Sequence, residues 1–152
     1  MRRFSPDCLD PKIHHCNLIQ SILAKIEATR AGADDAVMLD PRGFVAETNA
    51  THLFLVASGT VVTPRTIACP EGITRAAVLE LCRRNAIAFA ERDVSLMEFY
   101  RAAEVFCTGT MGELAAVKSI DGRDMPTPLP GPMTTRLESL FKELVRAEAE
   151  PV

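Results

Sequence analysis

The sequence predicts a single mixed α/β domain whose largely antiparallel sheet is flanked by helices. The chain has 152 residues, 47% of them apolar, which suits one ordinary domain with its own core. Helical and strand-like patterns follow one another in the order helix, strand cluster, helix, strands and helix. Short apolar runs separated by turn residues predict that much of the sheet is antiparallel.

The first half of the chain predicts one helix followed by four short strands. Apolar residues recur at helical spacing from residue 17 onward, and the pattern stops at Gly32, which suits a C-terminal cap. These apolar residues are Leu18, Ile19, Ile22, Leu23 and Ile26. Apolar runs follow at residues 36–40, 44–47, 52–57 and 60–63, with turn residues at 41–43 and 58–59. Their spacing predicts an antiparallel meander.

The second half predicts two longer helices with strands between them. Residues 74–85 carry a helical pattern with Val78 and Cys82 on its apolar side and a basic pair near its end, where the helix dipole favours positive charge. An amphipathic helix is predicted at residues 133–147. Between them we expect strands at 87–94, 104–108 and 113–120 and a short helix at 96–102.

Charge and composition exclude several classes of partner. The net charge is -3 with both signs interleaved, so the sequence has no basic stripe for nucleic acid and no polybasic tract for a membrane surface. The first residues carry charge and then a proline, without the apolar core of a signal peptide. We therefore expect a cytoplasmic protein whose cysteines are reduced thiols. The cysteines are Cys8, Cys16, Cys69, Cys82 and Cys107.

Three segments could bind parts of a small anionic cofactor, although each also suits an ordinary structural role. Residues 72–75, Gly-Ile-Thr-Arg, stand where a loop enters a helix, so free backbone N–H groups there could bind phosphate or simply begin a capped helix. Residues 108–112 follow a buried strand and could let a ligand approach the backbone or form a plain turn. Glu47 ends an apolar strand and could point into a pocket or be a solvated edge residue.

A fourth group of residues carries ligands of the zinc type. Cys8, His14, His15 and Cys16 match the spacing of no standard finger or ribbon, and neighbouring side chains in an extended segment point to opposite faces. We therefore predict no metal site, and a zinc-binding protein remains the alternative.

Taken together and in order, these segments resemble the class IV pyridoxal-phosphate aminotransferases of the branched-chain and D-amino-acid type. The resemblance covers about residues 10–144 and implies the large, cofactor-holding domain of that family, with a mixed, largely antiparallel sheet or pseudo-barrel flanked by helices. Residues 10–25, DPKIHHCNLIQSILAK, are similar to the family's D-P-K-I-K-S-L-N-Y-L-N-N-I-L-A-K. The other matching stretches are residues 39–54 to L-D-x-x-G-x-V-A-E-x-x-x-x-N-x-F, residues 71–75 to P-G-I-T-R, residues 104–113 to E-V-F-x-T-G-T-A-A-E, and residues 121–122 with 131–132 to the D-G and G-P of its ending.

The resemblance implies a role for each candidate residue. Glu47 would face the pyridine nitrogen of pyridoxal 5'-phosphate, where an ionised carboxylate keeps the ring protonated. Ile73 and Thr74 would offer backbone N–H groups to the phosphate, and Thr110 would add its hydroxyl. The backbone of Met111 and Gly112 would lie near the substrate carboxylate.

The sequence departs from the family at the position of its Schiff-base lysine. Aligned without a gap, that lysine falls on His14, and an imidazole cannot form a Schiff base. Lys12 is the nearby substitute; in a strand it would share a face with His14 at about 6.6 Å along the chain, so it could reach the cofactor only by rearrangement. Leu18 replaces a tyrosine of the branched-chain enzymes, and His52 stands at a usual asparagine.

Family members also carry a smaller N-terminal domain, which covers the cofactor and adds an arginine to the phosphate. We expect residues 1–15 to be a linker-like segment and first strand, residues 16–147 to be the large domain, and residues 148–152 to be a tail. Half of the active-site cleft would then have to come from another chain.

The resemblance thus implies an aminotransferase-like protein whose inherited reaction moves an amino group between an amino acid and a 2-oxo acid. We expect it to be inactive as this chain, because of His14 and the absent small domain, with pyridoxal phosphate bound non-covalently or lost. The alternatives are an active transaminase or lyase that uses Lys12 or a complementing chain, and a non-catalytic binding or scaffold module. A homodimer or higher homo-oligomer is expected, since the open inner face of the domain must be covered.

Overall fold

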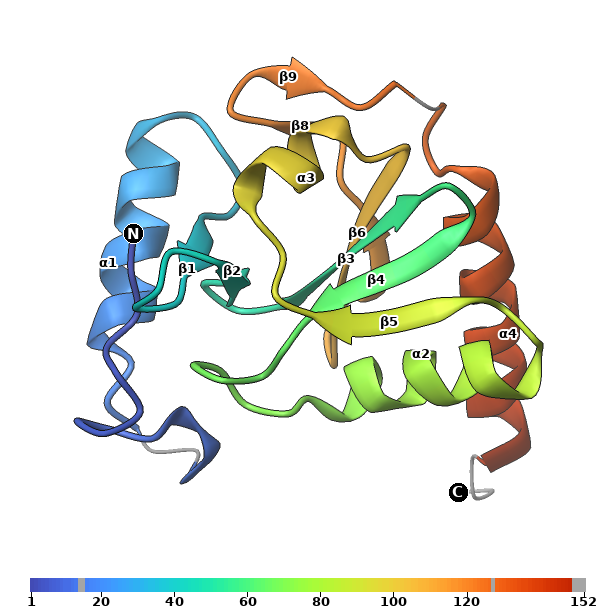
Figure 1. Cartoon of the computed structure of the whole chain (residues 1–152), viewed down its shortest axis with the longest axis horizontal. Helices are drawn as coiled ribbons and strands as arrows, with labels where there is room; N and C mark the ends of the chain where they lie inside the picture. Colours follow the sequence, from blue (N-terminus) through green and yellow to red (C-terminus); the bar gives the residue numbers. More distant parts are fainter. Residues whose placement is uncertain (14–15, 127, 149–152) are drawn as a thin grey trace.

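The computed structural model describes residues 1–13, 16–126 and 128–148 (Figure 1). Its centre is a five-stranded sheet in the order β5-β4-β3-β6-β7. Every neighbouring pair is antiparallel except β4 and β5, which are parallel. The predicted mixed, largely antiparallel α/β fold is therefore confirmed. The strands of this sheet are β3 (His52–Ala57), β4 (Thr60–Pro64), β5 (Phe89–Arg92), β6 (Glu104–Gly109) and β7 (Glu113–Ala116).

The two faces of the sheet carry separate cores. Because side chains alternate along a strand, Phe54 faces one side of β3 and Leu55 faces the other. On the first side, Phe54 stacks on Phe106 with ring centroids 4.9 Å apart, beneath α2 (Ile73–Arg84) and α4 (Pro132–Glu148). On the second side, Leu55 packs with Phe99 of α3 (Leu96–Arg101) and with Ile120 of the short β8 (Ser119–Ile120), whose partner strand is the exposed β9 (Arg123–Asp124). Figure 1 shows these elements on opposite faces.

The predicted meander is wrong in one respect. β1 (Val37–Leu39) and β2 (Val45–Thr48) pair with each other in a sheet of their own, while β3 pairs with β4 and β6. The reason lies in the turn after β2: the Thr48 hydroxyl accepts the N–H groups of Ala50 and Thr51. The free edge of β3 is then taken by β6, whose Phe106 stacks on Phe54. The strand predicted at 113–120 is likewise divided between β7 and β8.

The N-terminal part of the domain consists of an irregular segment and α1 (Ile19–Arg30), which stands beside β1 and β2 (Figure 1). The apolar residues that predicted α1 are exposed, and its buried residues are Ala24 and Ala28. The first strand expected within residues 1–15 is absent from residues 1–13, which contain an isolated bridge from Arg2 to Leu39 and the 3-10 turn η1 (Pro11–Ile13). Asp10 and Pro11 favour that turn, since the Asp10 carboxylate accepts the N–H of Lys12.

The N-terminal end of α4 is held by a buried carboxylate. Glu104 of β6 accepts hydrogen bonds from the N–H groups of Met133 and Thr134 and from the Thr134 hydroxyl. Negative charge is favoured at a helix N-terminus, so this contact joins α4 to the sheet. No helix among the described residues is long and apolar enough to cross a membrane.

Candidate functional site

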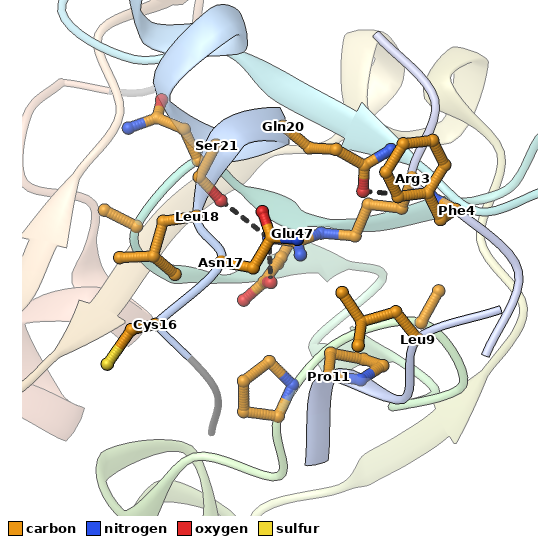
Figure 2. Close-up of a pocket in the computed structure, with 14 residues that line it drawn as sticks. Arg3, Phe4, Leu9, Pro11, Cys16, Asn17, Leu18, Gln20, Ser21 and Glu47 are labelled. Atoms are coloured by element: carbon orange, nitrogen blue, oxygen red, sulfur yellow. Dashed lines mark hydrogen bonds and ion pairs between the residues drawn. The ribbon is translucent and has the colours of Figure 1, made fainter. Parts of the chain in front are cut away.

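A cavity of about 400 Å³ opens between the N-terminal segment, the start of α1 and the end of β2 (Figure 2). Arg3 and Asn17 line it from the segment before α1, Ser21 from the first turn of α1, and Glu47 and Asn49 from β2 and its turn. Apolar side chains complete the wall. Its size and its few polar groups are typical of a small-molecule site.

Glu47 is the buried acid of this cavity. It lies opposite Met38 in the β1–β2 pair, in a strand that is buried throughout, and it is 5% exposed. Its Oε1 is ion-paired with the guanidinium of Arg3, and its Oε2 lies 3.7 Å from Nδ1 of His52. Burial raises the pKa of Glu47 to about 7, and the charge of Arg3 opposes that rise.

Arg3 was not among the residues singled out from the sequence. Its backbone N–H donates to the carbonyl of Leu39, and its guanidinium donates to the hydroxyl of Ser21 at 3.4 Å. Figure 2 shows the guanidinium between Ser21 and Glu47. An arginine in a segment without helical or strand periodicity gave no signal in the sequence, because its partners lie about 18 and 44 residues away along the chain.

His52 and Cys69 are buried next to Glu47. The atoms of these three residues that could ligate a metal all lie within 4.8 Å of one another. Burial and the charges of Arg75 and Arg3 lower the pKa of His52 to about 4. Burial, followed by the charge of Glu47, raises the pKa of Cys69 to about 12. A cation here would have to displace the thiol proton beside two guanidinium groups, so these surroundings suit a neutral, hydrogen-bonding cluster better than a metal.

His52 also connects Glu47 to the beginning of α2. Gly72, at φ 75°, immediately precedes α2, and a Cβ atom placed on it would lie 2.3 Å from Nε2 of His52. Only glycine fits this close approach with that backbone conformation. Ile73 and Thr74 follow in the first turn of the helix, where backbone N–H groups have no acceptor within the helix itself.

Lys12 lies at this helix end rather than in the cavity lined by Glu47. It lines a second depression with Glu71, Gly72 and Ile73, and its Nζ is 3.8 Å from Oε1 of Glu71. His14, at the position of the family lysine, lies outside the described residues, as does His15.

The remaining predicted residues lie on the turn between β6 and β7. Thr110, Met111 and Gly112 are exposed there and line neither of the two hollows. The strand that leads to this turn is paired with β3 at His52, opposite Thr108. The structure thus brings Glu47, His52 and the beginning of α2 together, and it leaves Thr110, Met111 and Gly112 outside that cluster.

Comparison with known proteins gives a consistent picture. The family model described as "Amino-transferase class IV" matches residues 1–120. A protein of Arabidopsis thaliana named branched-chain-amino-acid aminotransferase-like protein 2 is 50% identical over 151 residues, which are 99% of this chain and 27% of that protein. The branched-chain-amino-acid aminotransferase of Pseudomonas aeruginosa is 36% identical over 148 residues, covering 90% of this chain and 48% of the relative.

Solved structures agree in fold. The branched-chain amino acid aminotransferase from Escherichia coli superposes with a TM-score of 0.91 at 32% identity, over 99% of this chain and 52% of that one. The holo form, with PLP, of the enzyme from Thermobaculum terrenum gives 0.92 at 36% identity, over 97% and 49%. The chain spans about a quarter of the length of the Arabidopsis relative and about half of the others.

Proposed function

The chain belongs to the class IV aminotransferase family, and on that premise we propose that it is a branched-chain aminotransferase-like domain that holds a pyridoxal or pyridoxamine phosphate non-covalently. In this proposal the chain does not transfer amino groups by itself. Its ligands would be the cofactor and, in the inherited reaction, an amino acid or 2-oxo acid.

One observation carries the proposal: a buried carboxylate, Glu47, stands in the wall of a cavity of about 400 Å³. A protonated ring nitrogen is a suitable partner for that carboxylate, because a charged hydrogen bond formed away from water is strong. The bound cofactor would supply an electron sink for amino-acid chemistry.

The phosphate of such a ligand would lie at the beginning of α2. His52 contacts Glu47 on one side and Gly72 on the other, so the two ends of the site are neighbours. The N–H groups of Ile73 and Thr74 would bind the phosphate with the help of the helix dipole. Thr110, and Met111 with Gly112 for the substrate carboxylate, would join the site through a movement of their exposed turn.

The absence of a covalent bond follows from His14. A primary amine forms a covalent bond with the cofactor's aldehyde, whereas an imidazole does not form the same stable linkage. Lys12 has a primary amine, but its ion pair with Glu71 and its place in the second depression support a role away from the ring.

Pyridoxamine 5'-phosphate tests the proposal directly, because it carries no aldehyde and needs no lysine. Isothermal titration should detect its reversible binding to the parent chain and weaker binding to Glu47→Gln. Glu27→Gln is the matched control, since Glu27 is an exposed glutamate of α1 that does not line the cavity. Binding unaffected by Glu47→Gln would refute the assignment of the ring site. No binding to the parent chain would instead favour the scaffold alternative.

A further inference from the structure

We propose that Arg3 is the positioning residue that holds the Glu47 carboxylate ready for the ring nitrogen of the cofactor. The inference rests on the proposed function and adds to it a residue of the N-terminal segment. Arg3 acts through Glu47 and is not itself a reacting group.

The contact between the two side chains is close and nearly enclosed. A guanidinium nitrogen of Arg3 is ion-paired with Oε1 of Glu47, and the two side chains are 13% and 7% exposed. The titratable groups that face Glu47 are Arg3 from the N-terminal segment, His52 from β3 and Cys69 from the loop before α2. At 3.7 Å the contact from His52 is too long for a good hydrogen bond. Among the described residues, Arg3 is thus the cationic partner that fixes the carboxylate.

Two sets of contacts fix Arg3 itself. The backbone of the N-terminal segment is tied to β1, because Arg3 N–H donates to the Leu39 carbonyl at 2.8 Å and Leu39 N–H donates to the Met1 carbonyl at 2.9 Å. The side chain is steered by the Ser21 hydroxyl of α1 at 3.4 Å. Since the backbone tie does not use the guanidinium, the side chain can be replaced while the segment keeps its place.

The guanidinium also carries a buried N–H without an acceptor. Nε of Arg3 has no hydrogen-bond partner within the described part of the chain, although the residue lines the cavity. Buried donors are nearly always satisfied in proteins, so this unpaired N–H leaves Arg3 with hydrogen-bonding capacity that its contacts in the ligand-free chain do not use.

Loss of the Arg3 side chain should change the protonation state of Glu47. Burial raises the pKa of the Glu47 carboxyl to about 7 even though Arg3 lowers it. Without the guanidinium, burial acts unopposed, so the carboxyl keeps its proton to higher pH. A protonated carboxyl no longer offers the negative charge that a protonated ring nitrogen binds.

The test compares pyridoxamine 5'-phosphate with its 1-deaza analogue, in which carbon replaces the ring nitrogen, from about pH 6 to about pH 9. The parent chain should bind the natural compound more tightly as Glu47 ionises. Arg3→Met should lower that affinity about tenfold near neutrality and move the rise by about one pH unit or more toward higher pH. Arg3→Lys should restore most of the affinity. Arg2→Met, a change at the exposed neighbouring arginine, should leave it unchanged.

The deaza analogue separates positioning from simple support of the fold. It cannot form the contact with Glu47, so Arg3→Met should not weaken its binding. An equal loss for both compounds at every pH would overturn the inference, because it would mean that Arg3 only supports the cavity.

A second measurement keeps the inference testable if the parent chain binds neither compound, an outcome that refutes the proposed function. Carbon-13 NMR of the glutamate carboxyls in the ligand-free protein reports the titration of Glu47 directly. Arg3→Met should shift that titration to higher pH, and Arg2→Met should not. An unchanged titration would show that Arg3 does not control Glu47.

Discussion

Replacement of Gly72 by alanine should destabilise the domain more than the same replacement at another glycine with the same φ. Gly72 has φ 75°, and an added Cβ would lie 2.3 Å from Nε2 and 2.4 Å from Cδ2 of His52. His52 is buried between Gly72 and Glu47, so its ring has little room to move. Gly59, in the turn between β3 and β4, also has φ 75° but has nothing within 4 Å of an added Cβ.

The comparison of these two glycines distinguishes the cost of a positive φ from the cost of the clash with His52. A non-glycine residue in the left-handed region costs about 1–2 kcal/mol, which Gly59→Ala should show alone. The forced displacement of a packed side chain adds about 1–3 kcal/mol. Gly72→Ala should therefore lower the free energy of unfolding by about 2–5 kcal/mol.

Equilibrium denaturation in urea measures the free energy of unfolding of both variants. His52→Ala, alone and combined with Gly72→Ala, completes a double-mutant cycle. In the His52→Ala background, Gly72→Ala should cost less than it does in the parent chain, because the clash has been removed. The reasoning would be refuted if Gly72→Ala were no more destabilising than Gly59→Ala in the parent chain.

Other predictions concern α4, the sheet and the buried acid. Glu104→Ala should lower the free energy of unfolding by about 3 kcal/mol, because three donors at the start of α4 lose their acceptor, whereas Glu143→Ala on the exposed side of α4 should have little effect. Phe54→Ala should cost about 3–5 kcal/mol in the same assay, since it leaves Phe106 without its stacking partner in the core. Burial raises the pKa of Glu47 from 4.5 to about 7, so the folded state binds this proton more tightly than the unfolded state does. The resulting stabilisation is fully present below about pH 4.5 and is lost as the pH rises through about 7. Urea midpoints of the parent chain should therefore fall relative to those of Glu47→Gln between about pH 5 and about pH 8; parallel curves would contradict this.

Local patterns predicted the elements well but not all their partners. The periodicity of Val78 and Cys82 gave α2 to within one residue at either end, since a helix face repeats over its own length. The parallel pairing of β4 with β5 was not predicted, because it joins strands separated by a whole helix. The sequence also did not predict that Ile22 of α1 is exposed, because an apolar stripe indicates a contact surface without identifying what covers it.

Motifs in the sequence named part of the candidate site, whereas Arg3 enters it only through three-dimensional contacts. Glu47 and the beginning of α2 stand in short stretches that resemble the family, and the structure joins them through His52. Arg3 belongs to no such stretch, and its role follows only from its contacts with Glu47, Ser21 and Leu39. The assignments of Glu47, Ile73, Thr74, Thr110, Met111, Gly112, Lys12 and His14 remain predictions.

The central claim is that this chain has a cofactor cavity whose covalent attachment point is lost at His14. Reduction with borohydride in the presence of pyridoxal 5'-phosphate, followed by peptide mass mapping, tests it most directly. We predict no specific pyridoxyl label on the parent chain and a specific label at the substituted position in His14→Lys. A label on Lys12 of the parent chain, or the absence of any label in His14→Lys, would contradict the claim.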